Sequence, residues 1–105
     1  MSAHTPGPWH WEAVPVKGDP YGRVRYRVTA RGKTISQVYY SSYAGGLTNA
    51  EYDARLIAAA PQLLKELKSM CSVWVTVCNS KGWDPEHMSQ YVEARAAIKA
   101  AKGEA

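Results

Sequence analysis

Apolar and polar residues alternate with a period of two in the N-terminal part of the chain. In residues 23–30, Val24, Tyr26, Val28 and Ala30 alternate with Arg23, Arg25, Arg27 and Thr29. Successive side chains of a strand point to opposite faces, so this segment is predicted to be a half-buried antiparallel strand. Residues 33–41 are predicted to return as a second strand, after a hairpin turn at Arg31-Gly32.

A third strand is predicted at the tryptophan pair. Trp9 and Trp11 are two residues apart and would face the core together, with His10 and Glu12 on the other face. Residues 1–8 are rich in proline and glycine and are expected to form an irregular arm. The segment 9–41 is therefore interpreted as a three-stranded meander.

The period changes to that of a helix after residue 47. Thr48 and Glu51 have the spacing of a capping box, which predicts a helix that begins near Asn49. Pro61 is predicted to end this helix and to begin a second one. The second helix is expected to run to about residue 79.

A last helix is predicted over residues 85–101, because Asp84-Pro85-Glu86 has the preferred order of N-cap, proline and acid. The fold class is thus predicted to be α+β, with about three strands followed by two to three helices. The chain is short enough for a single domain, 1–105, with the arm at 1–8, the meander at 9–41 and the helical part at 48–101.

Nothing in the sequence predicts export or insertion into a membrane. The sequence has no run of eighteen apolar residues and no positively charged segment followed by an apolar leader. We expect a protein of the bacterial cytoplasm. Cys71 and Cys78 would lie about 10 Å apart along one helix, too far for a disulfide, and are expected to be reduced core residues.

The surplus positive charge lies in the first third of the chain. The net charge is +4, and beyond residue 33 acidic and basic residues balance. Up to that point Glu12 and Asp19 face a larger basic set, which consists of Lys17, Arg23, Arg25, Arg27, Arg31 and Lys33. This asymmetry favours an anionic partner at the N-terminal strands.

The arginine ladder, Arg23, Arg25 and Arg27, is the first candidate for a binding site. The three side chains would project from one strand face about 7 Å apart, and like charges so placed need water, carboxylates or phosphates beside them. Guanidinium groups match phosphate oxygens, and the neighbouring tyrosines could stack on a base. These tyrosines are Tyr39, Tyr40 and Tyr43. The alternative is a solvated face balanced by Glu12 or Glu51.

Three further residues complete the candidate ligand site. Asn49 lies where free helix N–H groups could hold an anion, although Glu51 and Asp53 oppose a phosphate there. Arg55 and Arg95 lie on or beside the apolar stripes of their helices. Their stems are expected to pack and their charged ends to reach solvent or pair with acids.

Catalysis has almost no support in the sequence. His4, His10 and His87 are scattered, without the spacing of a metal site or of a nucleophile and its base. We therefore expect no enzyme activity, no cofactor and no metal. A degradative nuclease or phosphodiesterase is the catalytic alternative.

Three blocks of the sequence carry a resemblance to a known family. Residues 4–9 read HTPGPW, residues 52–64 read YDARLIAAAPQLL, and residues 94–101 read ARAAIKAA. Together they resemble a family of small proteins encoded by phages and prophages, most of them without an assigned activity. Tyr52-Asp53 replaces the alanine-asparagine of the family pattern and Gln62 replaces its glutamate, so a role of that asparagine does not carry over.

The resemblance implies a viral protein made inside a bacterium. The layout, strands first and helices last, is similar to viral anti-defence proteins that sequester cyclic nucleotide or ADP-ribose-derived immune signals without cleaving them. We therefore expect a counter-defence protein that binds a phosphate-bearing nucleotide. The alternatives are a protein-directed inhibitor of a host defence complex, similar to an anti-CRISPR, and nonspecific nucleic-acid binding through the basic strand.

The apolar band of the second predicted helix leads to a first testable prediction. It is wider than one sheet face requires, and it consists of Leu63, Leu64, Leu67, Met70, Cys71, Trp74, Val75 and Cys78. Because a short chain can bury such a surface against another copy of itself, we expect a homo-oligomer. Light scattering at micromolar concentration should give a multiple of the chain mass, whereas the mass of one chain would contradict the prediction.

Overall fold

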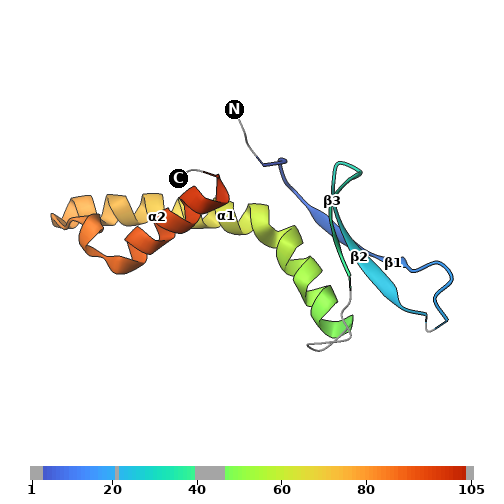
Figure 1. Cartoon of the computed structure of the whole chain (residues 1–105). Helices are drawn as coiled ribbons and strands as arrows, with labels where there is room; N and C mark the ends of the chain where they lie inside the picture. Colours follow the sequence, from blue (N-terminus) through green and yellow to red (C-terminus); the bar gives the residue numbers. More distant parts are fainter. Residues whose placement is uncertain (1–3, 21, 40–46, 104–105) are drawn as a thin grey trace. The chain divides into compact units, whose positions relative to one another are not determined.

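The computed structural model describes residues 4–20, 22–39 and 47–103 and has a three-stranded sheet followed by helices (Figure 1). This order confirms the predicted α+β fold class. The strands are β1 (His10–Pro15), β2 (Val24–Ala30) and β3 (Lys33–Val38). The helices are α1 (Leu47–Lys81), the short 3₁₀ helix η1 (Pro85–His87) and α2 (Ser89–Ala101).

The chain divides into two compact units within α1. Thr5–Pro61 form the sheet unit, which contains the three strands and the first part of α1. Gln62–Ala105 make up most of the helical unit, with the rest of α1, η1 and α2. Each unit has its own packing and is described separately.

The sheet is antiparallel, with β2 between β1 and β3. Trp11 pairs with Val28 and Glu12 pairs with Arg27, so the alternation of β1 is in phase with that of β2. The inner face carries Tyr26, Val28 and Ala30, all of them buried. The predicted division of the faces, with the tryptophans on one and the arginines on the other, is confirmed.

A tight turn and a bulge set the register of β3. Ala30 pairs with Lys33 across Arg31 and Gly32, whose φ angles of 53° and 78° are those of a type I′ hairpin turn. The pairing then shifts at Val28/Thr29, so that Ile35 is passed over in the ladder. Ile35 and Val38 therefore both pack on the core although they are three positions apart, an odd spacing that would place them on opposite faces of a regular strand.

The core of the sheet unit forms where α1 meets the inner face of the sheet. Tyr26 and Val28 lie against Ala50 and Ala54, which are 3% and 0% exposed. The alanines are four residues apart and thus share one side of the helix. Larger side chains close the edges of this contact: Trp9, Trp11, Val24, Ile35, Val38 and Ile57, together with Ala58.

The N-terminal arm has an internal hydrogen bond and packs against Pro61 of the same helix. The indole N–H of Trp9 donates to the carbonyl of Thr5 at 3.0 Å. A Cβ at Gly7 would lie 2.9 Å from the Cβ of Pro61, so only glycine fits at this approach without a shift. The block at residues 4–9 and the proline of the second block are thus in contact.

Helix α1 differs from the prediction in being continuous. Pro61 lies inside it, whereas the sequence pattern predicts the end of one helix and the start of another at this residue. The missing N–H removes one hydrogen bond, and the alanine, leucine and lysine residues on either side are strong helix formers. The helix also begins at Leu47, two residues before Asn49, and the side chain of the predicted cap, Thr48, lies outside the described residues.

In the helical unit, α1 ends in a Schellman motif. Gly82 has a φ of 72°, and the N–H of Trp83 donates to the carbonyl of Cys78 at 2.8 Å. Asp84 caps the next helical turn, as predicted, by accepting a hydrogen bond from the N–H of Glu86. The helix that it caps is only the turn η1, because Met88 is extended, and α2 begins at Ser89 and not at Pro85.

Several large apolar side chains of the helices are exposed. Leu63, Met70 and Val73 of α1 are exposed by 54%, 69% and 61%, whereas Cys78 is fully buried. Both cysteines are free. No helix in the described ranges is long and apolar enough to cross a membrane.

The contact between α1 and the sheet gives a stability prediction. Ala54→Leu inserts a larger side chain where the helix meets Val28, and overpacking of this kind should lower the free energy of unfolding by about 1–3 kcal/mol. Ala59→Leu is the matched control, because Ala59 is exposed on the same helix and should change stability by less than about 0.5 kcal/mol. Urea denaturation of both variants measures the difference. Equal midpoints would show that Ala54 is not packed as described.

Candidate ligand-binding face

The outer face of the sheet is the candidate site. From β1 it carries His10, Glu12 and Val14, and from β3 it carries Thr34 and Gln37. The arginine ladder lies between them, with Arg25 and Arg27 in β2 and Arg23 directly before that strand. Among the described residues of the sheet unit, the only helix packs on the inner face, through Ala50, Ala54, Ile57 and Ala58. Within this unit, no described helix covers the outer face.

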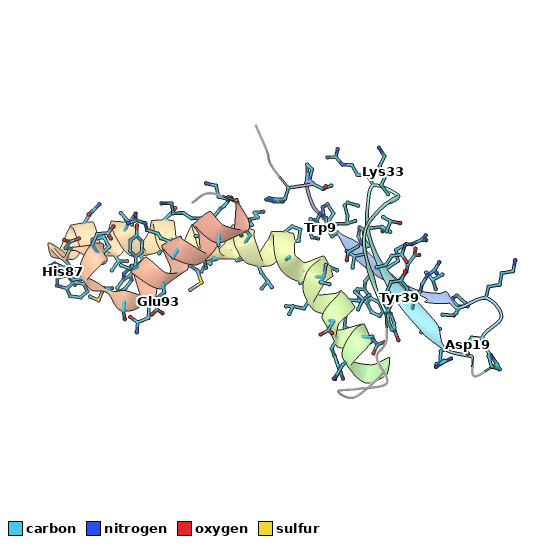
Figure 2. All side chains as sticks on the ribbon, in the orientation of Figure 1. Trp9, Asp19, Lys33, Tyr39, His87 and Glu93 are labelled. Atoms are coloured by element: carbon cyan, nitrogen blue, oxygen red, sulfur yellow. The ribbon has the colours of Figure 1, made fainter. Side chains whose placement is uncertain are left out.

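Arg23 is held by the loop between β1 and β2. Asp19 accepts hydrogen bonds from the backbone N–H, Nε and Nη2 of Arg23 at 2.9, 2.7 and 3.0 Å. Its side chain is only 2% exposed, and its backbone accepts a hydrogen bond from Gly22. Figure 2 labels Asp19 in this loop. This pair is built into the turn, so Arg23 is a structural residue of the loop.

Arg27 is neutralised across the strands. Its guanidinium donates to Glu12, the residue opposite it in β1. Both side chains are partly exposed, Arg27 by 40% and Glu12 by 48%. Water can screen and exchange such a pair, so it contributes little to stability.

Arg25 differs from its two neighbours. Its partner in the register is Val14, which offers no charge, and no carboxylate of the described residues pairs with it. Its Nε is buried and has no hydrogen-bond partner in the described structure. Leaving a buried donor unbonded costs about 1–3 kcal/mol, and an anion that rearranged this guanidinium could recover part of that cost.

Tyr39 adds an aromatic side chain next to the ladder. It follows the last residue of β3, is 64% exposed, and donates its hydroxyl to Oε1 of Gln37 at 2.8 Å. Figure 2 labels it at this end of the strand. The hydrogen bond to Gln37 indicates that the tyrosine follows the outer face, since residues two apart on a strand share a face. Tyr40 and Tyr43, the other predicted tyrosines, lie outside the described residues.

The remaining predicted site residues do not join this face. Arg55 lies on α1, pairs with Glu51 at 3.4 Å, and stacks over Trp11 and Tyr52 with its guanidinium 5.1 and 5.3 Å from the ring centroids. Asn49 is exposed in the first turn of the same helix. Both belong to the helix that covers the opposite face of the sheet.

Arg95 belongs to the helical unit. It pairs with Glu86 and lies over the ring of Tyr91, 5.5 Å from its centroid. The structure thus divides the predicted arginines into three groups: the ladder, the helix residue Arg55 beside the core, and Arg95. The sequence could indicate the bases and the acids but not these pairings, which depend on strand register and loop geometry.

The described residues contain no cluster of histidine, cysteine or acidic side chains that could hold a metal ion. His10 lies on the outer face opposite Thr29, and His87 is in η1, 3.7 Å from Asp84. What the outer face offers a ligand is hydrogen-bond donors and the guanidinium of Arg25, which has no carboxylate partner in the described part of the chain.

Comparison with known proteins identifies the setting of this chain. All of it, residues 1–105, matches the family described as Salmonella phage P22 protein Y8K6. The chain belongs to this phage protein family. The match confirms the expectation of a phage-encoded protein family. Searches of the curated proteins and of the solved structures found no match.

The two acidic partners of the ladder lead to a prediction. Asp19→Ala removes a buried carboxylate that accepts three hydrogen bonds, so the free energy of unfolding should fall by about 1–3 kcal/mol. Glu12→Ala, which breaks an exposed pair, should cost less than about 1 kcal/mol. Urea denaturation of the two variants tests the distinction between a structural and an exchangeable carboxylate. A larger loss for Glu12→Ala would reverse these assignments.

Proposed function

We propose that this phage protein is a non-catalytic counter-defence protein that sequesters a phosphate-bearing nucleotide on its outer sheet face. The ligand class is a cyclic nucleotide or an ADP-ribose-derived signal of host immunity, which the protein binds without cleaving. It acts in the cytoplasm of the infected bacterium.

The observation that carries the proposal is the unpaired guanidinium of Arg25. Acids of the sheet unit pair with Arg23 and Arg27, and Arg25 is the one arginine of the ladder that has no carboxylate partner among the described residues. A guanidinium fork matches the oxygens of a phosphate. The exposed ring of Tyr39 would supply a stacking surface for a base.

A protein-directed inhibitor is the second candidate function. It is favoured by the exposed side chains of Leu63, Met70 and Val73 on α1. Apolar residues three and seven positions apart lie on one side of a helix and could dock in a groove of a host protein. In that case the outer sheet face would bind no small molecule.

The central test is removal of the Arg25 guanidinium. Arg25→Ala should lose one charge-assisted contact worth about 1.5–3 kcal/mol, which corresponds to at least a tenfold weaker affinity. Isothermal titration calorimetry with ADP-ribose and with a cyclic dinucleotide measures the loss. Lys68→Ala is the matched control, because it removes one exposed positive charge from α1 and should bind as the parent does.

Each competing function has its own outcome in this experiment. An inhibitor of a host protein would bind neither nucleotide before or after the substitution. A nucleic-acid binder would prefer long polymers, with a steep dependence on salt. Mass spectrometry of the ligand released by denaturation separates sequestration from catalysis, since a chemically altered nucleotide would show that the protein is an enzyme.

A further inference from the structure

We infer that Arg25 and Arg27 form a single site for a diphosphate group, and that the carboxylate of Glu12 occupies half of this site when no ligand is bound. The inference rests on the proposed function, because it concerns the same face, and it specifies the ligand class. Glu12 then sets the affinity of the face by competing with the ligand.

The two arginines are close enough to act together. They are two residues apart on β2, so their Cα atoms lie about 7 Å apart on the same face. Long arginine side chains can converge over that distance on two adjacent phosphoryl groups. One guanidinium for each phosphoryl group is the arrangement that the bidentate geometry favours.

Glu12 is placed as an internal substitute for a phosphate. It lies opposite Arg27 in the strand register and accepts hydrogen bonds from Nε and Nη2, as a phosphate oxygen would. No acid takes the equivalent position at Arg25, where the partner is Val14. The proposed site therefore has two guanidinium groups, of Arg25 and Arg27, and one carboxylate, which occupies one of the two.

Exposure decides which carboxylate a ligand can displace. Asp19 is 2% exposed and bound to the loop backbone, so Arg23 stays with it. The Glu12 side chain is 48% exposed and can turn into water, where solvation compensates for the lost ion pair. A diphosphate that displaces Glu12 gains the second guanidinium as well as the first.

The test uses inorganic pyrophosphate and orthophosphate as probes. In wild-type protein, pyrophosphate should shift the ¹⁵N–¹H signals of the Nε–Hε groups of both Arg25 and Arg27. Glu12→Gln retains a side chain of equal size and removes the competing charge, so it should bind pyrophosphate about two- to fivefold more tightly, the range expected from an exposed ion pair. Orthophosphate, with one phosphoryl group, should bind more weakly to both proteins.

The controls separate this inference from the proposed function. Glu93→Gln makes the same charge change at an exposed position of α2 and should leave the affinity unchanged. If pyrophosphate shifts the Arg25 signal but never that of Arg27, or if Glu12→Gln binds no more tightly than wild type, the two-arginine site is wrong and the single contact at Arg25 remains. If neither signal moves in either protein, both the site and the proposed function are overturned.

Discussion

The close approach of α1 to the sheet is the contact on which the rest of the sheet unit depends. Ala50 and Ala54 present almost no side chain, so the helix backbone can lie directly over Tyr26 and Val28. This contact buries the apolar face of the three-stranded sheet, and packing against a helix is one of the ways in which a small sheet becomes stable in water. Because the helix covers the inner face, every charged residue of β2 must lie on the other. The arginine face is thus a consequence of the alanine contact.

The N-terminal arm and Pro61 add a second contact to the sheet unit. Gly7 lies where a Cβ would meet Pro61, and the Trp9 indole is bonded back to Thr5. Pro61 therefore acts at the surface of a continuous helix as the residue against which the arm packs. In the helical unit, the fully buried side chain among the described residues is that of Cys78, whose carbonyl accepts a hydrogen bond of the Schellman motif that ends α1. Gly7, Trp9, Ala54 and Ile57 accordingly contribute to the packing of the sheet unit.

The sequence predicts those features of the fold that depend on neighbouring residues in the chain, and fails for those that depend on residues far apart in it. Strand faces follow from a period of two and the cap at Asp84 from its own neighbours, so both are predictable. The prediction that a helix ends at Pro61 is wrong. The strong helix formers on both sides of Pro61 offset the cost of its one missing hydrogen bond, so the helix continues through it. The β3 bulge that brings Ile35 and Val38 to the core, and the pairing of Glu12 with Arg27, depend on strand register. For that reason the sequence presents the ladder as three equal cations, although only Arg25 lacks a partner in the described structure.

The energy of a single guanidinium limits what the outer face can do alone. One charge-assisted contact contributes about 1.5–3 kcal/mol, and stacking of one base about 1–3 kcal/mol. Micromolar affinity requires about 8 kcal/mol, so Arg25 and Tyr39 by themselves make a weak site. The proposed sequestration of a nucleotide would need further contacts. Arg27 supplies one such contact when the ligand displaces Glu12 from its guanidinium. A second copy of the chain would supply others if its own face lay across the same ligand, and such a site would make ligand binding and assembly mutually reinforcing, since each would stabilise the other.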